Sequence, residues 1–139
     1  DLALAADRNP PVLHPRSRDG RDAPRIEKHP AYVALERTAF ERFGLAAMSH
    51  RAGVFGAEAP LHPLVKYGLT FLLVQAEFGL CCPLSMTDAL TRTLRKFGDP
   101  ELVARHLPAL TSQDLETLAH GAMFMTEQQA GSDVGAVET

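Results

Sequence analysis

The sequence of 139 residues has no tryptophan, two tyrosines and two cysteines. The cysteines, Cys81 and Cys82, are neighbours, and a disulfide between adjacent residues closes a strained ring. A disulfide framework of the kind found in small secreted domains is therefore excluded, and we expect a reducing, cytoplasmic compartment. Without a basic neighbour to lower their pKa, the two thiols are interpreted as small apolar residues without a function of their own.

The sequence also lacks a strong charge of either sign. Fourteen basic and seventeen acidic residues give a formal net charge of −3. Binding to nucleic acid needs clustered Lys and Arg, and the basic residues here are scattered except in segment 7–28, where acidic residues largely cancel them. A hydrophobic content of 45% and a charged content of 22% are typical of one soluble globular domain.

No apolar run is long and clean enough to predict a membrane span. The longest apolar stretch, 64–84, is interrupted by Lys66, Gln75 and Glu77, which favours a helix inside a protein. No signal peptide is recognisable near the first residue, Asp1. Because Asp1 is not a Met, this leaves the question of an upstream targeting segment open.

The N-terminal part, 1–30, is predicted to be an extended arm. Five residues disfavour helix across it: Pro10, Pro11, Pro15, Gly20 and Pro24. From Pro30 the spacing changes to three and four residues, and this periodicity predicts a helical domain over 31–119. The apolar positions of its first helix are Tyr32, Leu35, Ala39, Phe43 and Ala46.

Three further helices are predicted in the domain. The second occupies the apolar stretch, and its segment 71–78 is expected to be the most buried part of the chain. The third runs over 84–97 and ends at Gly98, and the fourth begins at the cap Asp99 and stops near His106. One more helical turn is expected over 112–118.

Aromatic residues and a methionine at helical spacing allow two interpretations. They could line a cavity for an acyl chain, or they could belong to the ordinary core, which is the commoner role of such a stripe. The residues are Tyr67, Phe71, Phe78 and Met86.

After His120 the pattern changes again. Segment 122–126 is short and apolar without a helical polar face, so we interpret it as a β-strand. A lone strand needs partners for its backbone groups. We therefore expect 120–139 to be the start of a second, β-rich domain, of which this sequence contains only the first part.

The most informative segment is MTEQQAGSDV, from Met125 to Val134. It combines two hydroxyl side chains, a carboxylate and a small Ala-Gly pair, which suits a backbone wrapped around a phosphate-bearing ligand. An ordinary loop with Gly and Ser is the alternative interpretation.

A strand followed by Thr126, Glu127 and the Ala130-Gly131-Ser132-Asp133 turn resembles the flavin-binding signature of the acyl-CoA dehydrogenase superfamily. Gln128 departs from the proline that many members have there. Two other segments resemble the AidB-like, adaptive-response branch of that superfamily. They are RIEKHPAY, ending at Tyr32, and CPLSMT, ending at Thr87.

The resemblance implies that this chain is the all-α N-terminal domain of that fold, ending at the first strand of the central β-domain. It implies an FAD cofactor and an acyl-CoA substrate, with Ser132 near both. Because a carboxylate that faced a phosphate would repel it, we assign Asp133 to holding the turn, and we assign Glu127 a structural role as well. The implied cofactor-binding residues are Met125, Thr126, Ala130, Gly131 and Ser132. The resemblance assigns no catalytic residue to this chain, because the family's catalytic glutamate lies in a later domain.

Two functions follow from the resemblance as expectations. The first is an FAD-dependent oxidoreductase that acts on CH–CH groups of acyl thioesters. The second is a flavoprotein of the DNA alkylation response, which would contact DNA only through a C-terminal region outside this sequence. In either case the family implies a homo-oligomer, a dimer or tetramer.

We expect no metal site. The six histidines, at positions 14, 29, 50, 62, 106 and 120, show no spacing that places two on one helix face. They are interpreted as surface or capping residues.

Overall fold

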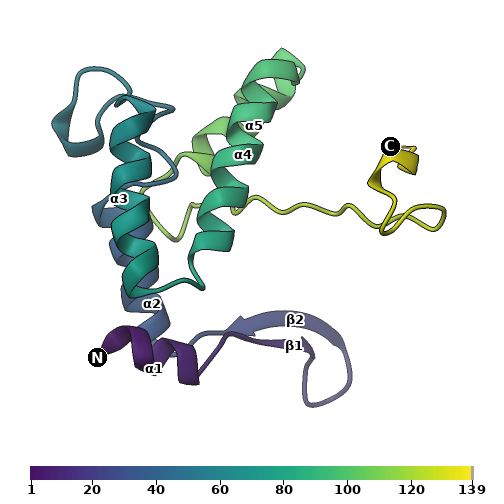
Figure 1. Cartoon of the computed structure of the whole chain (residues 1–139). Coiled ribbons are helices and arrows are strands. Elements are labelled where there is room, and N and C mark those ends of the chain that lie inside the picture. Colours follow the sequence, from purple (N-terminus) through teal and green to yellow (C-terminus); the bar gives the residue numbers. More distant parts are fainter. Residues whose placement is uncertain (139) are drawn as a thin grey trace.

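The computed structural model describes residues 1–138, which are mostly helical (Figure 1). The α-helices are α1 (Leu2–Arg8), α2 (Pro30–Arg37), α3 (Pro63–Ala76), α4 (Cys81–Phe97) and α5 (Pro100–Leu110). A π-helix spans Thr38–Arg42, and short 3-10 turns span Val54–Gly56 and Val134–Ala136. Strands β1 (Val12–Arg16) and β2 (Asp22–Glu27) form an antiparallel sheet, so the all-α expectation is wrong for the N-terminal region.

The N-terminal arm is a short helix followed by a β-hairpin. Val12 pairs with Glu27 and Leu13 with Ile26, and the register is irregular after His14. The arm that the sequence predicts over 1–30 therefore contains regular structure that the sequence did not predict. A two-stranded ribbon tolerates prolines because each strand has one free edge that needs no donor. The hairpin extends away from the helices, and nearly all of its residues are exposed (Figure 1).

Helix α2 begins where the sequence predicts. Pro30 occupies the first helical turn, and Nδ1 of the cap residue His29 accepts the N–H of Ala31 at 3.1 Å. The π-helix that follows adds one residue to a turn and rotates the later side chains. Phe40 is 1% exposed, whereas Phe43, one of the apolar positions that the sequence gives to this helix, is 38% exposed.

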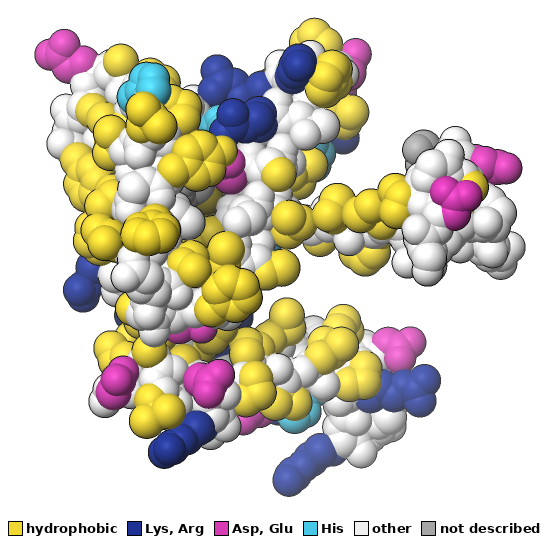
Figure 2. Space-filling view, viewed as in Figure 1, with side chains coloured by type: hydrophobic (Ala, Val, Ile, Leu, Met, Phe, Trp, Pro, Cys, Tyr) yellow, Lys and Arg dark blue, Asp and Glu magenta, His cyan; other side chains and the backbone are white. Residues whose placement is uncertain are grey.

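Helix α3 is the main departure from the sequence prediction. It is not the most buried element, since Phe71 is 67% exposed and Leu72 is 62% exposed, and the buried residue on it is Lys66. Figure 2 shows hydrophobic side chains along its outer face. The described helices cover only one side of α3, through Leu69 and Leu73. The apolar sequence of α3 is therefore not accompanied by burial of its side chains among residues 1–138.

The apolar stretch is two helices and not one. Helix α3 ends at Ala76, and Glu77 lies in the connection and not in mid-helix. Its carboxylate accepts the N–H groups of Gly79 and Leu80, both at 2.7 Å, just before α4. Glu77 thus marks the helix boundary.

The later helix boundaries agree closely with the sequence. Gly98 follows α4, and Oδ1 of Asp99 accepts the N–H of Glu101 at 2.8 Å to start α5. Helix α5 continues past the predicted end at His106 and includes Pro108, reaching Leu110. The expected turn over 112–118 is present, with a 2.9 Å bond from the Leu118 N–H to the Asp114 carbonyl.

The core lies where the π-helix, the loop after it and the start of α4 meet. Its buried residues are Ala39, Phe40, Leu45, Ala46, Ala47, Met48, Val54, Leu80 and Leu84. The loop is held from outside by Arg51, whose Nε donates to the carbonyl of Thr111 at 2.8 Å and whose Nη2 donates to Gln113 at 2.9 Å. This core fixes α4, against which the C-terminal segment begins.

Residues 122–138 extend away from the helices as a tail (Figure 1). The predicted strand over 122–126 is extended but has no strand partner among the described residues, so it is not a β-strand here. Phe124 is 93% exposed. Among residues 1–138 no helix has the length and apolar character needed to cross a membrane.

Candidate functional site

The decapeptide from Met125 to Val134 forms a compact turn in the tail. Its centre is Glu127, whose N–H donates to the carbonyl of Ala130 at 2.7 Å. The Glu127 carboxylate accepts the side-chain amide of Gln129 at 2.8 Å and the N–H of Glu138 at 3.0 Å. Glu127 therefore holds the turn closed, which is the structural role that the sequence analysis assigns to it.

Asp133 also stabilises the backbone. Its Oδ1 accepts the N–H of Gly135 at 3.2 Å and caps the 3-10 turn that begins at Val134. A carboxylate that accepts a neighbouring N–H is not free to face a phosphate, and the two negative groups would repel each other. The structure thus gives Asp133 the turn-holding role expected for it.

The polar groups that the sequence analysis assigns to ligand binding differ from Glu127 and Asp133, because they form no hydrogen bonds within the turn. Thr126 and Ser132 are exposed, and their hydroxyls have no hydrogen-bond partner among the described residues. The backbone N–H of Met125, also exposed, has none either. Donors that are satisfied only by solvent are available to a ligand. The turn therefore divides into residues that hold it and residues that are free to bind.

Of the Ala130-Gly131 pair, Ala130 is buried within the turn and Gly131 is exposed. Ala130 is 4% exposed. A Cβ atom on Gly131 would lie 3.9 Å from Cγ2 of Thr126, which is an ordinary contact. The turn itself would accept a side chain at Gly131, so contacts within the chain do not account for the glycine.

The tail is attached to the helices at Gly121. Its N–H donates to the hydroxyl oxygen of Thr87 at 3.0 Å, and the same hydroxyl donates to the carbonyl of Pro83 at 2.7 Å. A Cβ on Gly121 would lie 2.4 Å from the carbonyl oxygen of Met86, so no other residue fits. The start of the tail is therefore fixed on α4, although the rest extends freely.

His120, just before this point, packs on the core. Its ring makes an edge contact with Phe40 at 5.1 Å between centroids, and its Nε2 lies 3.6 Å from the buried carboxylate of Glu36. Burial lowers the pKa of His120, the nearby Lys28 lowers it further, and Glu36 opposes both. Lys28 itself donates to both oxygens of Glu36, at 2.7 and 2.9 Å.

A second polar cluster, which the sequence did not predict, lies inside the helices. Asp88 accepts from His50 at 2.7 Å through one oxygen and from Lys66 at 2.6 Å through the other. The side chains of His50 and Lys66 are 5% and 4% exposed. Burial raises the pKa of Asp88, but the hydrogen bonds from His50 and Lys66 outweigh it and hold that pKa well below its usual value.

This cluster corrects the interpretation of the histidines as surface or capping residues. His29 and His62 do cap α2 and α3, but His50 is a buried partner of a carboxylate. A signal was present in the sequence, because Lys66 is the one cation in an apolar stretch and a buried cation requires an anion. No group of three potential metal ligands lies together among residues 1–138.

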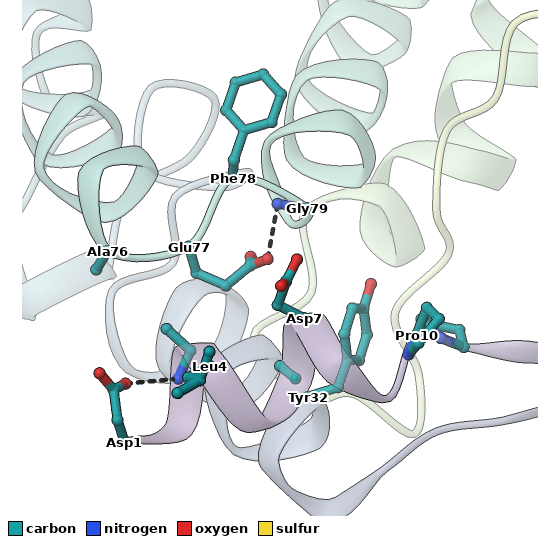
Figure 3. A pocket seen from close by; sticks show the side chains of 12 residues that line it. Asp1, Leu4, Asp7, Pro10, Tyr32, Ala76, Glu77, Phe78 and Gly79 are labelled. Carbon is teal, nitrogen blue, oxygen red and sulfur yellow. Dashed lines mark hydrogen bonds between the residues drawn. The ribbon is translucent and has the colours of Figure 1, made fainter.

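The hollow in Figure 3 lies between α1 and the connection from α3 to α4, and its volume is about 530 Å³. Both oxygens of Glu77, which lines it, are already occupied by backbone N–H groups. Burial raises the pKa of Tyr32 on the opposite wall, and Glu36 and Glu77 add to this effect. The decapeptide does not line this hollow, which therefore adds nothing to the candidate ligand site.

All five sequence-predicted site residues lie on one segment, and Thr126 and Gly131 approach each other within it. They supply donors and a close-approach surface on one side only. The groups that would face them from other directions are not among the described residues. No residue of the helical domain is brought to the turn.

Two solved structures are among those that have a fold similar to this chain. The apo form of Bd2924 is 33% identical, with a TM-score of 0.76 over 96% of this chain and 25% of that chain. Caenorhabditis elegans ACDH-11 in complex with C11-CoA is 23% identical, with a TM-score of 0.73 over 96% of this chain and 22% of that one. This chain thus spans about a quarter of their length.

A search of curated protein sequences finds no match. Residues 1–117 match the adaptive response protein AidB N-terminal domain family. The matched part includes both segments outside the tail that resemble the AidB-like branch. The chain therefore belongs to the AidB N-terminal domain family of the acyl-CoA dehydrogenase superfamily.

Proposed function

We propose that the full-length protein is an FAD-dependent oxidoreductase acting on CH–CH groups of acyl thioesters. In this proposal residues 31–119 are its N-terminal helical domain, and the segment from residue 120 begins its central β-domain. Membership of the superfamily supports the reaction class. A relative of the same fold, ACDH-11, was crystallised with an acyl-CoA, which supports the substrate class.

The observation that carries the proposal is that some polar groups of the decapeptide hold its turn while others have no partner. Glu127 and Asp133 bind within the turn, whereas Thr126, Ser132 and the Met125 N–H have no partner among the described residues. An ordinary surface loop does not require one set of residues to hold the turn and another set to stay unpaired. It also does not require a glycine at position 131, where a Cβ atom would make only an ordinary contact. These residues fit one edge of a flavin site.

When bound, the flavin accepts a hydride, and this reduction places negative charge on its pyrimidine edge. The Thr126 hydroxyl and the N–H groups of Met125 and Thr126 would donate to that edge and stabilise the charge, as donors stabilise an oxyanion. The Ser132 hydroxyl would donate to a pyrophosphate oxygen and lie close to the thioester. Ala130 and Gly131 would let the backbone approach the cofactor.

The proposal leaves the proton-abstracting base outside this chain. The two carboxylates within the decapeptide, Glu127 and Asp133, are engaged in holding the turn. A base from a later domain and a homo-oligomeric partner would complete the site. The isolated chain would therefore be inactive.

The test uses the full-length protein with Thr126→Val and Ser132→Ala. Thr126→Val deletes the hydroxyl while nearly keeping the shape, so it should weaken flavin retention or lower the reduction potential. Ser132→Ala should weaken pyrophosphate or thioester binding. Thr93→Val, at an exposed position on α4, is the matched control. Unchanged flavin content, potential and acyl-CoA turnover in both site variants would overturn the assignment.

A second function is favoured by the family itself, which is named for an adaptive response protein. In that case the same turn binds flavin, but the physiological role is protection of DNA during alkylation, through a C-terminal region. Thr126→Val would then lower flavin content without changing duplex DNA binding. Removal of basic C-terminal residues would abolish DNA binding without changing flavin content.

A further inference from the structure

A basic hollow lies on the helices, away from the decapeptide. Its volume is about 290 Å³, and it lies between the loop that follows the π-helix and helix α4. The residues that line it are Ser49, His50, Pro63, Arg92, Arg95 and Lys96. Figure 2 shows Lys and Arg side chains gathered in the upper part of the molecule between α3 and α4.

The spacing in the sequence places the three cations on one side of α4. Arg92 and Arg95 are three residues apart, and Arg92 and Lys96 are four apart, which are the separations of neighbours on a helix surface. Like charges at these separations repel each other. A cluster of this kind is stabilised by an anion that the three side chains share.

Two of the cations are held in place by the chain itself. Nη1 of Arg95 donates to the carbonyl of His50 at 2.7 Å, and Nη2 of Arg92 lies 3.4 Å from Asp88. A guanidinium has five N–H donors, so both keep donors for a ligand. Anchoring before binding reduces the conformational entropy that a ligand must overcome.

Asp88 does not neutralise the hollow. Both of its oxygens are used by His50 and Lys66. Arg92 also lies 3.4 Å from one of these oxygens, and no carboxylate among the described residues forms an ion pair with Arg95 or Lys96. The hollow keeps an excess of positive charge.

A hydroxyl in the hollow has no partner. The Oγ atom of Ser49 is buried, and no described residue forms a hydrogen bond with it. A buried polar group without a partner is costly, and native proteins usually satisfy such groups with water or a ligand. Ser49 lines the hollow together with Arg and Lys residues, and hydroxyl, guanidinium and ammonium groups are the donors that bind the oxygens of a phosphate.

Basic residues near a helix C-terminus also interact with the helix dipole without any ligand. That interaction explains the presence of Arg95 and Lys96 in the last turn of α4. It explains neither the unpaired Ser49 hydroxyl nor the hollow between the loop and the helix. We propose that this hollow is a binding site for a phosphoryl group, either inorganic phosphate or the monoester group of a small ligand. The site is independent of the proposed oxidoreductase function.

The experiment is calorimetric titration of the full-length protein with phenyl phosphate and, separately, inorganic phosphate at low ionic strength. Phenol serves as the uncharged control. Arg95→Gln should weaken binding about tenfold or more, because a charge-assisted bond is lost. Because Arg95 also holds the loop, Lys96→Gln is the second variant, with an expected loss of about threefold. Ser49→Ala should also weaken phosphate binding about threefold.

Arg105→Gln is the matched control, since it removes one positive charge from an exposed pair with Glu101 on α5. Tighter binding of phenyl phosphate than of phosphate identifies an esterified ligand, and equal binding identifies the free ion. Either result with the expected losses supports the site. The proposal is overturned if neither phosphate binds at millimolar concentration, or if Arg105→Gln weakens binding as much as Lys96→Gln does. It is also overturned if only duplex DNA binds.

Discussion

The helices and the tail are held together in different ways. In the helical domain, hydrogen bonds join residues far apart in the sequence, such as His50 with Asp88 and Arg51 with Thr111. Beyond Gly121 the described hydrogen bonds join residues at most eleven positions apart, as between Glu138 and Glu127. The helical domain thus has a core of its own, whereas the tail has only a local turn.

Under the proposed function, this difference indicates where the flavin site would be completed. The turn is shaped by its own residues and keeps its binding groups free, but nothing in residues 1–138 covers it. A site that contacts a ligand from one side binds it weakly, because the few contacts must first offset the conformational entropy lost when the tail becomes ordered. Contacts from other sides raise the affinity. The helical domain supplies a fixed starting point for the tail, at Gly121 on α4.

The largest expected effect is on the buried cluster of the helical domain. Asp88→Asn removes the charge that pairs with Lys66 inside the protein, and breaking such a pair costs about 3–5 kcal/mol. Chemical denaturation of the 139-residue chain measures this loss. Glu101→Gln, the same change in an exposed pair with Arg105, should cost less than about 1 kcal/mol.

The same carboxylate gives a pH dependence. Because the folded chain lowers the pKa of Asp88, its contribution to stability is present above the ordinary value of 3.8 and is lost as the pH falls below it. The Asp88→Asn chain should lack this component. Equal losses of stability for Asp88→Asn and Glu101→Gln would contradict the buried ion pair.

The next effect compares the core with the outer face of α3. Leu84 is 3% exposed and Leu72 is 62% exposed. Leu84→Ala should cost about 2–5 kcal/mol of unfolding free energy, and Leu72→Ala about 0.5 kcal/mol or less. If Leu72→Ala proved the more costly of the two, α3 would be packed in the way that its sequence suggests, and the described arrangement would be wrong.

A smaller effect is expected where the tail meets α4. Gly121→Ala forces a methyl group against the carbonyl oxygen of Met86, which should cost about 1–3 kcal/mol or detach the tail. Gly68→Ala on α3 is the control, because a Cβ there meets no atom within 4 Å. In a helix that change should stabilise by about 0.5–1 kcal/mol. The two alanine variants should therefore shift the denaturation midpoint in opposite directions.

The smallest effect is the titration of His120. Burial lowers its pKa in the folded chain, so the unfolded chain binds the proton more readily, and stability declines as the pH falls below about 6.5. His120→Gln should remove this decline, and the same change at the exposed His106 should not. Thermal unfolding between pH 7.5 and 5.5 measures it. A decline that persists in the His120→Gln chain would assign the effect to another group.

Local signals predicted much of the helical domain. The caps at His29 and Asp99, the prolines after them and the glycine at 98 are short-range features, and the structure has each helix end within a few residues of them. The helix α5 end was missed because Pro108 is accommodated inside the helix.

Features that depend on neighbours could not be predicted from periodicity. The π-helix moved Phe40 into the core in place of Phe43, and α3 exposes residues that its composition would bury. The hairpin was not predicted because its two strands pair only with each other and lack a clear alternation of apolar and polar residues. For the candidate site, the sequence predicted the decapeptide and the structural parts of Glu127 and Asp133, while the role of its binding residues remains a prediction.

The most direct measurement of the central claim, that the decapeptide is one edge of a flavin site, is the affinity for FAD. The 139-residue chain and the full-length protein are titrated side by side by flavin fluorescence. The account predicts that the full-length protein retains FAD and that the 139-residue chain binds it with a Kd above the micromolar range, since one edge must order a loose tail. A submicromolar Kd for the 139-residue chain, or a full-length protein that binds no FAD, would contradict it.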